Sequence, residues 1–217
     1  MIRRAVLACA LVLGQGCAAV SVQEVSRPSV EPDNARTMDD DGWVTLARAR
    51  IAVAAHNDRD NAGFIGPGIV VPLPIFPMPA SWLAAPRKEP TFWIDVAIDP
   101  EGEGFAFDPS QVRVSVGAAA DLAPVRMKGP SAVARQADRR YSSRLCGFDP
   151  SSGEARAVQR VVLTQMSCVS LEFDVAEPTP DVTFTVRVRG LSDSGQAVAA
   201  PAVNFSKARR TNLEVLP

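Results

Sequence analysis

Strict alternation of apolar and polar residues is the feature that most limits how this chain can fold. The alternation runs through residues 111–116, 169–175 and 182–189, and residues 92–98 place an apolar side chain at every second position. Successive side chains of a strand point to opposite faces of its sheet. The pattern therefore predicts antiparallel strands that are half buried, with one face in a core and the other in solvent.

Turn sequences separate these segments. Asp-Pro-Glu-Gly occupies residues 99–102, and Ser-Asp-Ser-Gly occupies residues 192–195. Two more strands are expected at residues 43–55 and 196–205, the second at a sheet edge because Pro201 interrupts it. Many short strands on this spacing predict an all-β fold, an antiparallel β-sandwich of immunoglobulin-like type, with a small barrel as the alternative.

The N-terminus has the composition of an export signal. Arg3 and Arg4 precede an apolar run at residues 5–13, and small residues then lead to Cys17. This order is typical of a secretory signal peptide. The run is too short to span a bilayer core of about 30 Å, which needs about 20 apolar residues. An uncleaved membrane anchor over residues 5–22 is the alternative, and the glycines and glutamine within that stretch disfavour it.

The sequence LGQGC at residues 13–17 resembles the lipobox of bacterial lipoproteins. In that family the cysteine receives a diacylglyceryl group and the chain is cut before it. The resemblance implies that residues 1–16 are a signal peptide and that Cys17 carries the lipid anchor. VLAC at residues 6–9 matches as well, but a cut before Cys9 would leave too short an apolar run for export. Ala18 stands where an aspartate would signal inner-membrane retention, so the resemblance implies the outer membrane, facing the periplasm.

The remaining chain divides by composition. Residues 17–41 are acidic and poor in apolar side chains, so we expect a lipidated, disordered tether that holds the domain away from the membrane. Residues 42–217 are expected to form the β-sandwich domain.

Two cysteines remain in that domain, Cys146 and Cys168. Because exported domains fold in an oxidising compartment, we expect them to form a disulfide bond, worth about 3 kcal/mol in the chain-entropy model. Two separately buried thiols are the alternative. A zinc site is disfavoured because no histidine lies near either cysteine in sequence.

Composition and motifs exclude several functions. The chain has 23 basic and 24 acidic residues and a formal net charge of −1, unlike the strongly basic proteins that bind nucleic acid. No glycine motif for phosphate binding occurs, so no cofactor is expected. His56, the single histidine, lies in a polar segment and is expected to be a solvated turn residue rather than a catalytic base.

Two acidic clusters were considered as calcium sites. Residues 58–69 begin like an EF-hand loop, but Ala62 and Ile69 stand where ligands are required. Asp99, Glu101, Glu103 and Asp108 surround a glycine-rich turn and are expected to be solvated. No metal site is therefore predicted.

Residues 66–79 are unusually rich in both proline and apolar side chains. Prolines at every second or third position disfavour a central strand and favour an extended polyproline-like path. We expect either a crossover packed over the sandwich's end or a surface that contacts a partner or the membrane. The candidate interaction surface consists of Ile69, Val71, Leu73, Ile75, Phe76 and Trp82.

Residues 126–160 carry eight basic and three acidic side chains. This local excess of positive charge predicts a solvated arginine-rich loop or a face for anionic lipid or an acidic partner. A short helix beginning at Ser131 and reaching Tyr141 is also expected there.

No catalytic residue is predicted from these patterns. The sequence favours a non-enzymatic binding or scaffolding module in the periplasm, held to the membrane by its lipid and facing a possible envelope protein partner. The alternative is a glycan or lipid hydrolase whose carboxylates no motif reveals. A carrier of a small ligand or cation is a third hypothesis.

Overall fold

Strands make up nearly all of the regular structure. The computed structural model describes residues 17–31, 38–39, 41–57, 59–67, 76–77, 91–131, 145–146 and 154–216, and only the backbone of residues 17–23, 59–67, 76–77 and 210–216. The strands are β1 (Cys17–Val30), β2 (Trp43–Thr45), β3 (Ala49–Ala55), β4 (Arg59–Pro67), β5 (Phe76–Pro77), β6 (Phe92–Pro100), β7 (Phe105–Phe107), β8 (Arg113–Val116), β9 (Pro124–Ser131), β10 (Val161–Leu163), β11 (Ser167–Phe173), β12 (Phe184–Arg187), β13 (Leu191–Asp193), β14 (Gln196–Ala197) and β15 (Ala202–Leu216). Within the described residues, the 3-10 helix η2 (Pro109–Gln111) joins β7 to β8.

The strands form three sheets with antiparallel pairings. Their orders are β5-β4-β1-β15-β12-β8, β10-β7-β13-β14 and β2-β3-β6-β11-β9. The all-β class predicted from the alternation is thus confirmed. Within the described ranges, no helix combines the length and the apolar character that crossing a membrane requires.

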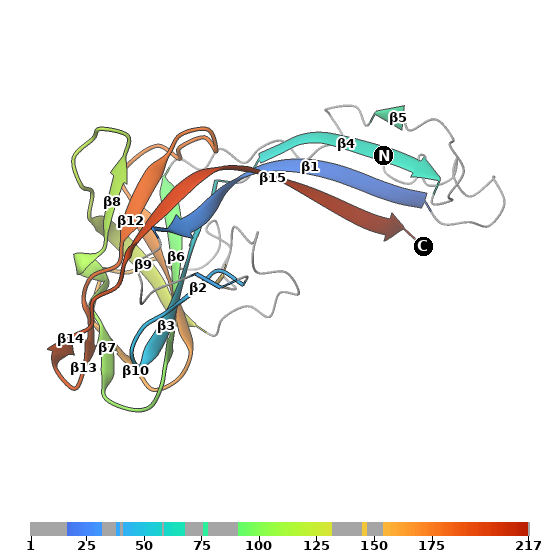
Figure 1. Cartoon of the computed structure of the whole chain (residues 1–217). Coiled ribbons are helices and arrows are strands. Elements are labelled where there is room, and N and C mark those ends of the chain that lie inside the picture. Colours follow the sequence, from blue (N-terminus) through green and yellow to red (C-terminus); the bar gives the residue numbers. More distant parts are fainter. Residues whose placement is uncertain are drawn as a thin grey trace. The chain divides into compact units, whose positions relative to one another are not determined.

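The chain divides into two compact units. Unit 1 draws on Met1–Glu24, Arg59–Arg87 and Arg209–Pro217, and unit 2 on Val25–Asp58 and Lys88–Ala208. Unit 1 contains β4, β5, the first part of β1 and the last part of β15 (Figure 1). The prediction of a single domain over residues 42–217 did not foresee this division, because β4 pairs with β1, which lies before residue 42.

The sheets of unit 2 are layered as in a β-sandwich (Figure 1), and the larger of two apolar clusters among the described residues draws on all of them. The five-stranded sheet supplies alternate residues of β3, β6 and β11, and the facing sheets supply residues of β7, β8, β12 and β15. The Phe92 and Phe184 rings contact each other at 5.3 Å across the two layers, and each also lies against a ring of its own sheet, Phe173 for Phe92 and Phe205 for Phe184. Burial of such rings is the main stabilising contribution.

The four strands predicted from strict alternation are present as β6, β8, β11 and β12. The segment expected as one strand at 43–55 is two, β2 and β3, joined by a turn in which the Leu46 amide donates to the Ala49 carbonyl at 2.8 Å. The segment 196–205, expected as one edge strand, is also two: β14 lies at a sheet edge, but β15 begins after Pro201 and lies between β1 and β12, so the edge prediction is wrong for it. Ser131, the expected first residue of a helix, is the last residue of strand β9. The rest of the expected helix, residues 132–141, lies outside the described ranges.

The expectation that these strands are half exposed is wrong for β6 and β11. Asp95, Ser170 and Glu172 are the polar members of the alternation, and all three are at most 2% exposed. Their face is also covered, in part by Leu145 and Cys146. Alternation of polar and apolar residues shows that the two faces of a strand differ chemically. It does not show which face is exposed to solvent.

The expected disordered tether is replaced in part by strand β1. β1 pairs with β4 from Cys17↔Pro67 to Glu24↔Arg59, with one irregularity after Val22. Val20, Val22 and Val25 lie among polar residues, which suits a strand, and Val25 is buried. This pattern is short, and the acidic residues 31–41 that follow it favour a disordered segment.

Candidate functional site

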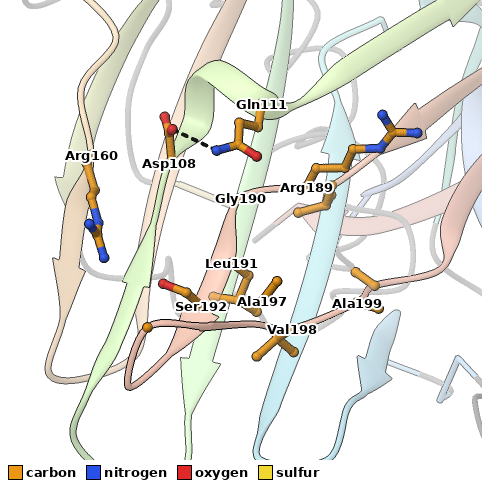
Figure 2. Close-up of a pocket in the computed structure, with 13 residues that line it drawn as sticks. Asp108, Gln111, Arg160, Arg189, Gly190, Leu191, Ser192, Ala197, Val198 and Ala199 are labelled. Carbon is orange, nitrogen blue, oxygen red and sulfur yellow. Dashed lines mark hydrogen bonds between the residues drawn. The ribbon is translucent and has the colours of Figure 1, made fainter.

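Unit 2 contains a cleft of about 630 Å³ bounded by η2 and the β12–β15 region (Figure 2). Its polar lining comes from Asp108, Gln111, Arg160, Arg189 and Ser192. Its apolar lining consists of Val188, Leu191 and residues 197–200. A concave surface that combines apolar walls with a few polar groups is the usual form of a binding site.

Asp108 organises one wall of the cleft. It caps η2: its carboxylate accepts from the Ser110 amide at 3.1 Å and the Ser110 hydroxyl at 2.6 Å, and from Gln111 Nε2 at 3.0 Å (Figure 2). Hydrogen bonds from Ser110 and Gln111, with a smaller contribution from the charge of Arg160, lower the pKa of Asp108. The carboxylate is therefore ionised at neutral pH and already engaged.

Gly190 forms the floor beside Asp108. The Asp108 amide donates to the Gly190 carbonyl at 3.0 Å, and Gly190 has φ +85°. A Cβ at this position would overlap the Asp108 carbonyl oxygen. Only glycine allows both this backbone conformation and this close approach.

Two guanidinium groups flank the cleft without an ion-pair partner among the described residues. Arg160 and Arg189 are exposed and lie on opposite sides of the view in Figure 2. Arginine donates several hydrogen bonds in a planar fork that suits carboxylate and phosphate groups. The arrangement suits a ligand with an acidic group and an apolar portion.

The cleft has little of what acid–base catalysis requires. Glycoside hydrolysis uses two carboxyl groups, one of them a proton donor with a raised pKa. The described lining has one carboxylate, Asp108, and its pKa is lowered. Its chemistry favours binding.

A second polar cluster lies within unit 2, centred on Asp95 of β6. Asp95 is fully buried, and its Oδ1 accepts from the Ser170 hydroxyl at 2.5 Å, while Oδ2 accepts from the amides of Leu145 and Cys146, both at 2.8 Å. Strand register places Ser170 directly opposite Asp95. These contacts satisfy a carboxylate that would otherwise be costly to bury.

His56 belongs to this cluster, so its prediction as a solvated turn residue is wrong. Its side chain is 2% exposed, and Nε2 lies 3.0 Å from Asp95 Oδ1 without the alignment of a hydrogen bond. The His56 amide donates to the Trp93 carbonyl at 3.0 Å, which extends the β3–β6 pairing by one residue. That extension carries the side chain onto the covered face, a result of register that the local sequence does not reveal.

Serine, histidine and aspartate meet here in an order that differs from a catalytic triad. In a triad, histidine lies between the carboxylate and the serine and takes the hydroxyl proton. Here Ser170 donates to Asp95 itself, and Ser170 is 1% exposed. The arrangement is structural.

Cys146 and Cys168 form a disulfide bond beside this cluster, which confirms the predicted pair. Among the described residues, the three-donor group of metal-ligand type is Asp95 with these two sulfurs. Because the sulfurs are bonded to each other, neither is a thiolate that could bind a metal in this form.

The other candidate residues are dispersed. Cys17 begins β1 and Phe76 begins β5, whereas Ile69, Val71, Leu73, Ile75 and Trp82 lie outside the described residues. The four acidic residues considered for calcium form no ligand group in the described ranges; Asp99 instead pairs with Arg50 at 2.5 Å. The cleft was missed because its residues come from separated segments, and the local signals were only Gly190 and the Asp108-Pro-Ser cap.

With the fold and these sites defined, the chain was compared with known proteins. No protein-family model, curated protein or solved structure matches it significantly.

Proposed function

We propose that this chain is an exported lipoprotein of the outer membrane, facing the periplasm, whose β-sandwich unit binds a ligand or an envelope partner without catalysing a reaction. The lipobox-like residues 13–17 support lipidation at Cys17 and removal of residues 1–16. Layered antiparallel sheets around one core support an immunoglobulin-like arrangement for unit 2.

The observation that carries the proposal is the buried Cys146–Cys168 disulfide. Disulfides persist in oxidising compartments and are rare in the cytosol of ordinary bacteria. A signal peptide at residues 1–16 would deliver the domain to such a compartment. The two features lie in different parts of the chain and support export independently.

The cleft supports binding as the activity of the sandwich. Arg160 and Arg189 offer positive charge, Leu191 and its neighbours offer apolar area, and Asp108 is occupied in capping η2. We therefore assign to the cleft an anionic ligand with an apolar portion.

Lipidation is tested by replacing Cys17 with serine in cells supplied with a clickable fatty acid. We expect the Cys17→Ser protein to lose the label and to leave the membrane fraction. Cys9→Ser is the matched control, because the second lipobox-like match ends there, and it should keep both properties. Labelled, membrane-bound Cys17→Ser protein would refute lipidation at this residue.

Binding is tested by titrating the isotope-labelled protein with hexyl phosphate, an anion with an apolar chain, and with neutral hexanol. We expect hexyl phosphate to shift NMR signals of residues 188–200 and Arg160, and hexanol to do so much less. An Arg160→Gln/Arg189→Gln variant should lose the response, whereas Arg156→Gln, which removes an exposed arginine outside the cleft, should keep it. Equal responses to both compounds would argue against an anion site.

A further inference from the structure

The first strand of unit 1 begins at the residue that the lipobox marks for acylation. Cys17 is the first residue of β1 and pairs with Pro67, the last residue of β4. Ala18 and Ala19 follow, opposite Gly66 and Ile65. A lipid on Cys17 would thus be attached directly to a paired strand.

A third strand lies beside this end. β5 pairs with β4 through Ile65↔Phe76 and Phe64↔Pro77. Because neighbouring strands lie about 4.8 Å apart, the Phe76 backbone is about 10 Å from that of Ala19, two residues from Cys17. Residues that are distant in sequence therefore meet at one end of the sheet.

The charge of the β1–β4 ladder changes along its length. The pairs from Cys17↔Pro67 to Val22↔Ala62 contain no charged residue. At the other end, Gln23 pairs with Asp60 and Glu24 with Arg59, and Glu24 lies 3.9 Å from Arg209 of β15. Within the β1–β4 pairs, the uncharged part is the one that carries Cys17.

We propose that this uncharged end, defined by residues 17–19, 64–67 and 76–77, contacts the bilayer in which the Cys17 lipid is embedded. The inference rests on the proposed lipidation. Acyl chains enter the membrane from Cys17, and the backbone of residues 76–77 lies within about 15 Å of it, which places these residues in reach of the headgroup region. Phenylalanine and isoleucine are stabilised there, whereas the ionised residues at the other end are better placed in water.

This geometry changes the role expected for residues 17–41. A disordered tether would leave unit 1 free to leave the membrane surface, whereas a strand that begins at the lipidated residue keeps this end of unit 1 against it. The anchor and the protein surface then bind the same bilayer together, and each lowers the entropic cost of the other.

The experiment uses the mature lipoprotein with one added thiol. Cys17 is acylated and Cys146 and Cys168 are bonded in that form, so Phe76→Cys can be labelled uniquely with an NBD fluorophore. Gln23→Cys is the matched control, on the same ladder but about 20 Å from Cys17 along β1. Both proteins are reconstituted into phosphatidylethanolamine–phosphatidylglycerol vesicles with and without a shallow doxyl lipid.

We expect blue-shifted emission and quenching by the doxyl lipid at position 76, and neither at position 23. Equal solvent exposure at both positions, with fatty-acid labelling of Cys17 intact, would overturn the membrane contact and leave the lipoprotein proposal standing. Loss of that labelling would refute the lipoprotein proposal and this inference with it. Blue-shifted emission of a Cys9→Ser/Cys17→Ser/Phe76→Cys protein in lipid-free buffer would also overturn it, because protein would then cover the site.

Discussion

The two faces of the five-stranded sheet are both buried, yet they are built from opposite kinds of residue. The inner face presents aliphatic and aromatic side chains of β3, β6 and β11 to the main core. The outer face presents His56, Asp95, Ser170 and Glu172 together with small residues such as Ala97. The inner face is specified by hydrophobicity, whereas on the outer face Asp95, Ser170 and Glu172 each depend on hydrogen-bond partners.

The partners on the outer face come from several parts of the chain. Glu172 accepts from Thr91 at 2.8 Å and from Arg126 Nη2 at 2.6 Å. Lys128 lies over the Trp93 ring at 5.2 Å. Each of these contacts needs a group of matching geometry, so we expect most polar substitutions on the outer face to lower stability, even conservative ones. On the inner face, the loss of stability should depend mainly on the side-chain volume that a substitution removes.

The largest effect is expected from the inner face. Phe173→Ala removes a fully buried ring that lies 6.5 Å from that of Phe92, and should lower the free energy of unfolding by about 3–5 kcal/mol. Urea denaturation measures this. Val162→Ala, at a valine that is 74% exposed, should change it by less than about 0.5 kcal/mol. Similar losses in the two variants would contradict the assignment of the core.

On the outer face, loss of the disulfide should have the largest effect. Replacing both Cys146 and Cys168 with serine should lower stability by about 3 kcal/mol in the chain-entropy model. Guanidinium denaturation of this variant should agree with that of the reduced natural chain. If both have the same free energy of unfolding as the oxidised protein, the disulfide does not stabilise the fold by restricting the unfolded chain.

A smaller loss is expected from Asp95→Asn, about 1–3 kcal/mol. The amide keeps the shape of the carboxylate but not its charge, so the hydrogen bonds from the Leu145 and Cys146 amides become weaker, and the Ser170 hydroxyl must turn from donor to acceptor. Hydrogen exchange at Leu145 and Cys146 should accelerate. Asp99→Asn is the control on the same strand, where a partly exposed ion pair with Arg50 is worth about 0–1 kcal/mol. Unchanged exchange at Leu145 would show that Asp95 does not hold that segment.

The smallest effect is expected from Ser170→Ala, about 1 kcal/mol for one hydrogen bond to Asp95. Combined with Asp95→Asn, the serine variant should cost less than it does alone, because it then removes a neutral hydrogen bond instead of a charge-assisted one. If the losses of stability in this double-mutant cycle are additive, Ser170 does not act through its hydrogen bond to residue 95.

The sequence predicted the parts of the fold that depend on local chemistry. Alternation located β6, β8, β11 and β12, and cysteine counting located the disulfide. The sequence did not predict that His56 and Asp95 lie side by side. Their contact depends on the β3–β6 register and on the residues that cover the outer face of the sheet. The cleft likewise combines Asp108, Arg160 and Gly190 from separate segments, and no local pattern links them.

The hydrogen bonds that Asp95 accepts have a consequence for the order of folding and oxidation. They hold the Cys146 backbone beside the strand that contains Cys168 through contacts that do not involve the sulfurs. Two thiols separated by 22 residues would otherwise meet only through closure of a flexible loop. In the folded chain, the hydrogen bonds to the Asp95 carboxylate keep the two thiols close together and so give them a high effective concentration. We therefore expect the disulfide to form after folding, as a fast intramolecular reaction.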